Sequence, residues 1–349
     1  NSAPVMVGGV APGDARNLGV ERAYIADNVI GGGCWTAVYI WHSSDNVIDG
    51  NVIHDVAHRA LQIYDGYNNA QIGLGFLSQG NRFVGNEIYG APGGLFIGAW
   101  PPAIHTDNSG TVVVNNYFHD LSDFGVAFGY TDSADVEISG NTIEQTVGGI
   151  MAVSAASLTD AILNGNAVVD PLGAGIQLNN MDRVGLAGQD VTGLASWWAV
   201  FLQDSKETGI TGSNVSGNAG GIALVNCTDG FVEYSTIHGN SGAGINISSA
   251  AADTMRIRFN SIVGNTVGIE NWSGTILYAS LNWWGSEEGP WTPTNPTGLG
   301  EVIWFTNVVY SPWLGVDPDG DPGTAGVQVL GPVLIVVDDV GLEPLDGYL

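Results

Sequence analysis

The sequence predicts an all-β solenoid, a rod of about eleven stacked coils, from three patterns in its 349 residues. The first is the tripeptide Asn-x-apolar, which returns about every 25 residues. The second is Gly-apolar-x-apolar, which follows the Asn by about nine residues, as at 94–97 and 125–128. The third is a composition of 52 glycines with only 12% charged residues. Alternating short apolar runs closed by Gly or Asn indicate strands, and a fixed period indicates stacked repeats.

Stacked coils place equivalent residues in columns, because neighbouring parallel strands lie about 4.8 Å apart. We expect the Asn residues to occupy left-handed corners, which Asn tolerates well, and to bond from coil to coil. This Asn column comprises Asn28, Asn51, Asn86, Asn116, Asn141, Asn166, Asn214, Asn260 and Asn282, with Gln189 and Ser235 in two further coils. Two apolar columns, from Ile53 to Ile262 and from Val38 to Ile269, are predicted to fill the interior. Two longer spacings predict insertions at about 66–81 and 98–111.

The charge balance excludes several functions. Eight Lys and Arg against 35 Asp and Glu leave a net charge of −27. Nucleic-acid binding is therefore not expected, since phosphate contacts need clustered basic residues. Apolar runs such as 333–337, which is five residues long, are well short of the roughly 20 of a membrane span. Cys34 and Cys227 lie about eight coils apart, so we expect two free thiols rather than a disulfide.

A tryptophan-rich string near the end of the repeats is more specific. It reads Asn282-Trp-Trp-Gly-Ser-Glu-Glu-Gly-Pro290, followed by Asn295-Pro296 and by Tyr310-Ser-Pro-Trp-Leu314. With the repeat over about 20–315, the chain resembles the right-handed parallel β-helix superfamily of pectate lyases and NosD-like proteins. The string is similar to the terminal coil of secreted β-helix repeat proteins. The resemblance implies a single right-handed β-helix with a Trp-rich cap; a sugar-stacking platform is the alternative for the tryptophans.

The chain is expected to divide into a β-helix over 1–314, an Asp/Gly/Pro linker over 315–326 and a C-terminal strand over 327–349. In the linker, Asp317, Asp319 and Asp321 alternate, and such carboxylates can supply several oxygen ligands to Ca²⁺. A solvated acidic spacer is the alternative. The short terminal strand must pack on the rod, begin a further domain or pair with a neighbouring chain. Residues 1–22 show no capping helix, which predicts an open edge on the first coil.

Chemistry is expected beside the two insertions, where five of the six histidines lie. His54, Tyr89, His119 and Glu144 share one position in consecutive coils, which predicts an outward-facing row. Polysaccharide hydrolysis needs two carboxylates about 5 to 9.5 Å apart, which Asp55 and Asp120 could provide. The alternative is that these polar pairs merely end strands. The candidate catalytic residues are His54, Asp55, His119 and Asp120, and the candidate substrate-binding residues are Arg59, Tyr89, His105 and Asp107.

Four Asn-x-Ser/Thr triplets are candidate glycosylation sites. They begin at Asn214, Asn226, Asn246 and Asn271. We expect Asn246 and Asn271 to be the most favourable of the four, as surface positions in a secreted protein.

Together these features predict an extracellular or cell-surface structural or adhesive protein. It would be the subunit of a fibre or sheath that assembles through its ends or terminal strand, stabilised by Ca²⁺ and glycosylated. Its partners would be further copies of itself, cell-surface molecules or polysaccharide. The alternative is a glycoside hydrolase or polysaccharide lyase that uses the His/Asp row, although the residue signatures of pectate lyases, polygalacturonases and mannuronan epimerases are absent. A third hypothesis is that the protein is a tail-spike-like glycan binder.

Overall fold

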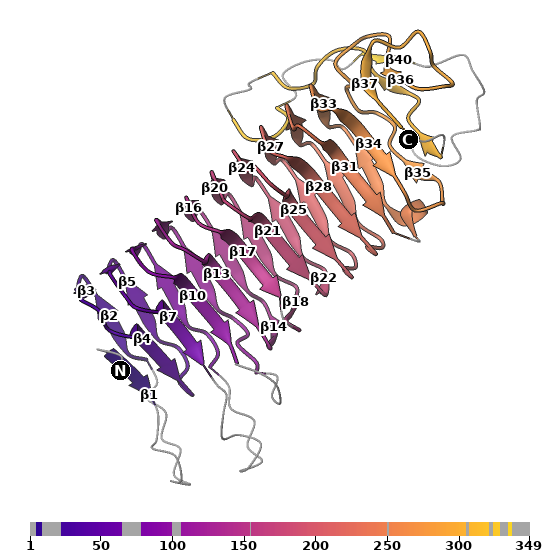
Figure 1. Cartoon of the computed structure of the whole chain (residues 1–349). Coiled ribbons are helices and arrows are strands. Elements are labelled where there is room, and N and C mark those ends of the chain that lie inside the picture. The colour runs from indigo at the N-terminus through magenta and orange to yellow at the C-terminus, as the bar shows by residue number, and fades with distance from the viewer. Residues whose placement is uncertain are drawn as a thin grey trace.

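The computed structural model describes residues 5–8, 22–64, 78–99, 106–153, 155–249, 251–304, 307–320, 324–328 and 334–336. These residues form a rod of stacked coils along which three parallel sheets run (Figure 1). Strands that are neighbours in a sheet are about one repeat apart in the sequence. The predicted all-β solenoid is confirmed, and sheets of 11, 12 and 10 strands agree closely with the coil number expected.

The first of these, the long sheet, has 11 strands, most of them six residues long. Its strands in order are β1 (Val5–Gly8), β4 (Thr36–Trp41), β7 (Arg59–Tyr64), β10 (Gly93–Gly98), β13 (Phe124–Gly129), β17 (Gly148–Val153), β21 (Ala174–Asn179), β25 (Trp198–Gln203), β28 (Gly220–Val225), β31 (Ala243–Ser248) and β34 (Val267–Asn271).

The second sheet has 12 shorter strands. A further sheet has three strands, each of which directly precedes a strand of the second sheet in the sequence. The second sheet contains β2 (Tyr24–Ala26), β5 (Val47–Asp49), β8 (Arg82–Val84), β11 (Val112–Val114), β15 (Glu137–Ser139), β19 (Ile162–Asn164), β23 (Gly185–Ala187), β26 (Gly209–Thr211), β29 (Phe231–Glu233), β32 (Arg256–Arg258), β35 (Leu277–Tyr278) and β38 (Val308–Val309). The small sheet contains β14 (Asp132–Ala134), β18 (Ser157–Thr159) and β22 (Met181–Asp182).

The third sheet has ten strands of three residues each. They are β3 (Val29–Gly31), β6 (Val52–His54), β9 (Glu87–Tyr89), β12 (Tyr117–His119), β16 (Thr142–Glu144), β20 (Ala167–Val169), β24 (Asp190–Thr192), β27 (Asn214–Ser216), β30 (Thr236–His238) and β33 (Ser261–Val263). The remaining elements are a 3-10 turn, η1 (Ala252–Thr254), and the short strands β36 (Pro290–Trp291), β37 (Gly300–Val302), β39 (Trp313–Leu314) and β40 (Ile335–Val336).

The interior consists of the two predicted apolar columns. In the long sheet every predicted member from Val38 to Ile269 pairs with the next, and each is at most 1% exposed. In the third sheet the column from Ile53 to Ile262 is in register as well, with Val215 completing it. Each apolar side chain therefore packs on its equivalents in the coils above and below, which explains the period of the sequence.

A ladder of buried polar side chains runs beside this core. The backbone N–H of Asn86 donates to Oδ1 of Asn116 at 2.9 Å, and that of Asn116 donates to Oδ1 of Asn141 at 3.0 Å. Bonds of this kind link coil to coil, except that the side-chain amide of Asn166 is the donor to Gln189; the members are Asn28, Asn51, Asn86, Asn116, Asn141, Asn166, Gln189, Ser213, Ser235, Asn260 and Asn282. The predicted coil-to-coil bonding is confirmed.

Two details of the predicted ladder are wrong. Ser213, not Asn214, occupies the position after Gln189, whose N–H donates to Ser213 Oγ at 3.1 Å. In addition, the left-handed corner belongs to the residue before the ladder residue, as at Gly140 and Gly165, both with φ 62°. The ladder side chain must point inward to reach its partners, so the chain turns one residue earlier, where glycine adopts positive φ without strain.

The two ends of the rod differ. At the N-terminal end, β2 and β3 are the outermost described strands of the second and third sheets, and β1 is that of the long sheet. Most of residues 1–22 lies outside the described ranges, so the open edge stays a prediction. At the other end, Ile303 forms a bridge with Ile269 of β34, so residues 282–314, called here the end segment, lie against the last coil. Trp284 and Trp313 are buried in this segment. Trp272, Trp291 and Trp304 are exposed on or beside it.

The described part of the C-terminal region folds back on the rod. Strand β40 pairs antiparallel with β39 of its own chain. Of the three expectations for the terminal strand, the described residues therefore agree with packing on the rod. The backbone N–H of Val327 donates to the carbonyl of Tyr234 at 2.8 Å. No helix in the described ranges is long and apolar enough to span a membrane.

The predicted insertions lie largely outside the described residues. Their bounds were predicted too wide, because the coils resume by Ser78 and by Thr106. The backbone N–H of Ser43 donates to Ser78 Oγ at 3.2 Å, and Thr106 forms a bridge with Thr131. Strands β7 and β10 are the last strands before these two stretches in the chain.

Candidate functional site

The predicted His/Asp row lies on the outer side of the third sheet. His54 pairs with Tyr89, Tyr89 with His119, and His119 with Glu144. The Tyr89 ring stacks between the two imidazoles, with centroid distances of 5.4 Å to His54 and 5.0 Å to His119. Tyr117 stacks on His119 from the same strand and donates its hydroxyl to Glu144 at 2.8 Å. The row is thus a continuous stack of aromatic and polar side chains.

The two carboxylates of the row serve as strand corners. Asp55 and Asp120 have φ values of 51° and 53°, the left-handed region that ends each strand. Each lies within hydrogen-bond distance of Nδ1 of the preceding histidine, at 2.9 Å for His54 and 2.8 Å for His119. Their side chains are 71% and 62% exposed. General acid catalysis by a carboxyl group usually relies on burial, so the catalytic role of these four residues stays a prediction with little support from their surroundings.

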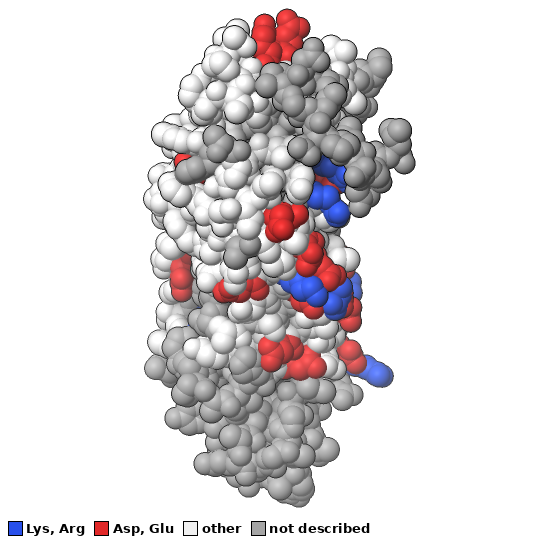
Figure 2. Space-filling model, turned by 90° about the vertical axis from the view of Figure 1, so that its right-hand side faces the viewer, with Lys and Arg blue, Asp and Glu red and all other residues white. Residues whose placement is uncertain are grey.

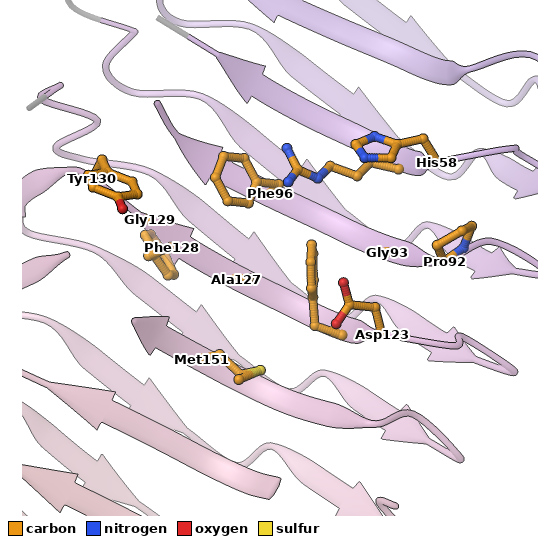
Figure 3. A pocket seen from close by; sticks show the side chains of 12 residues that line it. His58, Pro92, Gly93, Phe96, Asp123, Ala127, Phe128, Gly129, Tyr130 and Met151 are labelled. Carbon is orange, nitrogen blue, oxygen red and sulfur yellow. The ribbon is translucent and has the colours of Figure 1, made fainter. Parts of the chain in front are cut away.

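A hollow of about 310 Å³ opens instead on the outer side of the long sheet (Figure 3). Its walls come from β7, β10, β13 and β17 and from the turns beside them. The lining residues are His58, Arg59, Pro92, Gly93, Phe96, Asp123, Phe124, Ala127, Phe128, Gly129, Tyr130 and Met151. Aromatic and aliphatic surface dominates, with one cation, one carboxylate and one imidazole among the lining groups. Such a combination is typical of small-ligand sites.

Small residues in the outward columns create this space. Gly93 pairs with Arg59, and a Cβ at Gly93 would lie 2.7 Å from the ring of Phe124. A Cβ at Gly129 would likewise lie 3.2 Å from the ring of Phe96. The two rings therefore lie over bare backbone, and the hollow remains between them.

Arg59 is the central charged group of the hollow. Its side chain is only 8% exposed, and its guanidinium carbon lies 3.8 Å from the centroid of Phe96 and 6.0 Å from that of Phe124. Burial lowers the pKa of Arg59, while the charge of Asp123 opposes that shift. An arginine remains charged under such conditions. The aromatic faces thus hold a planar cation that is largely shielded from water.

His58 supplies a neutral group at the rim. Its ring stacks on Trp35, with centroids 4.7 Å apart and planes 7° from parallel. Burial lowers the pKa of His58, and the positive charge of Arg59 adds to the effect, so the imidazole is neutral at pH 7. Toward the N-terminal end of the same face, Tyr39 contacts both Trp41 and Tyr64, with ring centroids 6.0 Å apart in each pair. The aromatic surface therefore extends beyond the hollow over β4 and β7.

The predicted substrate-binding residues do not form one group. Tyr89 lies in the row of the third sheet, whereas Arg59 lies in the hollow of the long sheet. Asp107 accepts hydrogen bonds from the Gln79 side chain at 2.8 Å and from the Ser109 N–H at 2.9 Å, so it belongs to a coil turn. His105 lies outside the described residues. The sequence pattern does not predict the hollow, although small residues such as Gly93 and Ala127 next to large side chains are a signal of it.

The described part of the chain contains no group of three or more His, Cys, Asp or Glu residues placed to hold a metal ion. Asp317 and Asp319 line a second hollow, of about 350 Å³, against the third sheet, where Thr236 Oγ1 donates to Asp319 at 3.4 Å. Asp321 lies outside the described residues, so the Ca²⁺ site stays a prediction.

The glycosylation triplets differ in accessibility. Asn271 is 2% exposed, and its amide donates to the carbonyls of Thr275 and Asn307, so the expected surface position is wrong. Asn246 is half-buried and donates to Glu270 at 3.0 Å. Asn214 is half-buried as well, whereas Asn226 is exposed at a strand corner. Modification at any of the four stays untested, and Asn226 is the most accessible.

The two cysteines are free, as predicted. Cys227 is buried, and burial raises the pKa of its thiol to about 11.

On the face shown in Figure 2, most of the described surface carries no charge, and basic side chains lie beside acidic ones. Ion pairs of this kind include Arg183 with Asp160 and Arg258 with Glu233, both at 2.7 Å. Because 35 Asp and Glu stand against eight Lys and Arg, most of the remaining charged side chains of the chain are carboxylates.

Among solved structures, the chain is similar to the A-module of the mannuronan C-5 epimerase AlgE6 of Azotobacter vinelandii, with a TM-score of 0.51 and 15% identity over 84% of this chain and 83% of that one. It also matches the periplasmic alginate epimerase AlgG, with a TM-score of 0.48 and 14% identity over 76% of this chain and 70% of that one. A tailspike of bacteriophage CBA120 matches with a TM-score of 0.41 and 10% identity over 82% and 46%. At these identities the first match shows a shared fold.

No curated protein matches the sequence. The family model described as the right-handed beta helix region matches residues 19–180 and 156–283, which is more than half of the chain. This match agrees with the three parallel sheets and with the register of their columns. The chain belongs to the right-handed β-helix family.

Proposed function

We propose that the protein binds polysaccharide outside the cell or at its surface, along the outer face of the long sheet. One sugar unit would occupy the hollow around Arg59, and its neighbours would lie on the aromatic surface of β4 and β7. The observation that carries the proposal is a buried arginine held between Phe96 and Phe124 in an open hollow. The AlgE6 module, whose name gives mannuronan as its substrate, shares the fold.

Sugar rings match this surface chemically. One side of a pyranose presents C–H groups, which pack on the electron-rich face of an aromatic ring. The hydroxyl groups at the edge then need polar partners, which Asp123, His58 and Tyr130 supply around the hollow. Parallel coils also repeat the same surface in steps of about 4.8 Å, so an extended glycan can run across several strands.

Arg59 favours a sugar that carries a carboxylate or sulfate. With a net charge of −27 the protein repels polyanions at long range. At short range, a guanidinium that is largely shielded from water nevertheless attracts a carboxylate and can pair with it through its N–H donors. We therefore propose an acidic polysaccharide in which only some residues are charged.

Replacement of Phe96 by Ala is expected to weaken binding of an acidic polysaccharide about tenfold, because it removes the ring that contacts both Arg59 and the sugar. Titration calorimetry against a panel of acidic and neutral polysaccharides would measure the affinities. Phe231→Ala on β29 is the matched control, since this ring belongs to the second sheet. Equal affinities of the Phe96 variant and the unchanged protein would contradict the proposal.

Arg59→Lys tests the charge preference. It keeps the positive charge but loses the planar donor pair, so we expect at least a tenfold loss for acidic polysaccharides and no change for neutral ones. An equal loss for both classes would mean that Arg59 supports the shape of the hollow and does not recognise the charge of the sugar.

The same panel reports on catalysis, because release of new reducing ends or unsaturated products would make the protein an enzyme. Loss of such release in His119→Ala, but not in Phe96→Ala, would locate it at the row of the third sheet.

A structural role is the second candidate, favoured by exposed apolar side chains on the first described coil. A hollow of about 480 Å³ at this end is lined by Val5, Tyr24, Ile25, Asn28, Val29, Ile30 and Gly31, of which Tyr24 is 67% and Val29 is 74% exposed. Strands β2 and β3 have no outer neighbour among the described strands, and free strand edges support end-to-end pairing. We expect concentration-dependent filaments in electron micrographs, absent in Val29→Lys. A monomer at all accessible concentrations would exclude this role and leave polysaccharide binding standing.

A further inference from the structure

A second, shorter ladder of buried amides runs toward the C-terminal end of the rod. The backbone N–H of Asn218 donates to Oδ1 of Asn240 at 3.0 Å, and that of Asn240 donates to Oδ1 of Asn265 at 3.2 Å. Each side-chain amide also donates inward, to the carbonyls of Val191, Val215 and Ile237 in turn. In each amide the oxygen thus accepts a hydrogen bond from one coil, and the NH₂ group donates a hydrogen bond to another.

Glu301 of β37 occupies the next step of this ladder. It accepts from the backbone N–H of Asn265 at 2.9 Å through Oε1, as an asparagine would. Its own backbone N–H donates to the carbonyl of Trp284 at 2.7 Å. A carboxylate has no NH₂ group, however, and its Oε2 is buried without a hydrogen-bond partner among the described residues. The side chain is 8% exposed, so water cannot easily compensate.

Glu301 lies where the end segment meets the last coil. A Cβ at Gly268 of β34 would lie 2.8 Å from Cβ of Glu301, so the two strands are in close contact. Next to it, Ile303 bridges Ile269, and the Trp304 N–H donates to the Ile269 carbonyl at 3.3 Å. The carboxyl group therefore lies at the junction that keeps the end segment on the edge of the long sheet.

Burial raises the pKa of Glu301 to about 7, and the N–H groups of Asn265 and Gly264 partly oppose this shift. Other acidic groups on the packed elements point elsewhere. Glu270 of β34 accepts hydrogen bonds from Asn246 and Trp272, Glu287 and Glu288 are exposed, and His238 of β30 is exposed on the outer side. The shift thus arises from the burial of Glu301 itself.

We propose that Glu301 is a proton-dependent latch, which holds the end segment on the last coil as a neutral acid and weakens that contact once it ionises. In its neutral form the group keeps Oε1 as the ladder acceptor and buries no charge. Ionisation places a negative charge with one unpartnered oxygen inside the junction. Opening would solvate the carboxylate and uncover the edge of β34, where another strand can pair.

The direction of the pH dependence follows from linkage. The folded group holds its proton more tightly than the unfolded one, whose pKa is near the ordinary 4.5. The stabilising contribution is therefore complete below about pH 4.5 and is lost as the pH rises to about 7 and slightly above. Because one pKa unit is a factor of ten, the equilibrium between closed and open junction changes by about two orders of magnitude over this range.

Amide hydrogen exchange of the full chain, corrected for the intrinsic pH dependence of exchange, tests the latch. We expect protection of the N–H groups of Glu301, Ile303 and Trp304 to fall about 100-fold between pH 5 and pH 8, while the mid-rod strands stay unchanged. Glu301→Gln keeps the acceptor, adds the missing NH₂ and cannot ionise, so its junction should stay protected at both pH values. Glu288→Gln, at an exposed position, should behave like the unchanged protein.

Two outcomes would overturn the latch. The first is junction protection in the unchanged protein that does not vary between pH 5 and pH 8, a result that does not depend on whether the Glu301 variant folds. The second is the same pH-dependent loss of protection in the Glu301→Gln variant, which would assign the effect to another group. Neither outcome bears on polysaccharide binding at the long sheet.

Discussion

Asn116→Leu, which replaces a side chain by one of similar size, is expected to lower the free energy of unfolding by about 4 kcal/mol. The Asn116 side chain accepts from both nitrogens of Asn86 at 2.9 Å and donates to the Phe83 carbonyl at 2.9 Å and to Asn141 Oδ1 at 2.9 Å. Leucine would leave several of these buried groups without partners, at about 1–3 kcal/mol each. Chemical denaturation followed by circular dichroism would measure the loss.

Asn28→Leu is the matched control for this prediction. It removes the same side chain from the same ladder, but Asn28 is exposed in the first described coil. The backbone N–H of position 28 still donates to Asn51 Oδ1, so the loss should stay below about 1 kcal/mol. Equal losses at both positions would mean that the ladder contributes through local turn geometry and not through buried hydrogen bonds.

Gly149→Val is expected to destabilise the rod by about 3 kcal/mol or more. Gly149 precedes the inward Ile150 of β17, and its φ is not in the left-handed region, so its glycine is not required by a turn. A Cβ there would lie 2.3 Å from the carbonyl oxygen of Gly175 in the next coil and 2.7 Å from a methyl group of Val168. The backbone of a stacked coil cannot retreat without disturbing its neighbours.

Gly185→Val separates this steric effect from the general cost of replacing glycine in a strand. Gly185 begins β23, and a Cβ there would meet no atom within 4 Å. Because valine favours extended backbone, this variant should be neutral or slightly stabilising. Thermal unfolding of the two variants side by side gives the comparison. A similar drop in melting temperature for both would refute the packing explanation for Gly149.

The glycine pattern shows how far the sequence could be interpreted. Glycines such as Gly140 and Gly165 are corners with positive φ, as the repeat suggested. A second set, which opens the motif Gly-apolar-x-apolar, has another cause: a Cβ at Gly125 or Gly149 would collide with the side chain of Ile143 or Val168 from the third sheet. The sequence shows that both sets recur, but only the packing of one sheet on another explains the second.

The misplaced ladder member has a similar cause. Asn214 and Ser213 are neighbours, and both precede Val215 in a coil where either could be aligned with the repeat. The hydrogen bonds place Ser213 inside and turn Asn214 outward, where its amide donates to Asp190 at 2.7 Å. The repeat predicts that a polar residue of this coil joins the ladder, but it does not distinguish Ser213 from Asn214. The left-handed corner at Gly212 makes the next residue, Ser213, the member of the ladder.

The sequence by itself determined the fold, the register of both apolar columns and the order of His54, Tyr89, His119 and Glu144 along one face. It could do so because stacked coils convert a fixed spacing in the chain directly into contact in space. Only the tertiary structure decided that Arg59 leaves that face and joins Phe96 and Phe124 around a hollow. These residues occupy different positions of the repeat, and the space between them depends on the missing side chain at Gly93, so no periodicity records their contact.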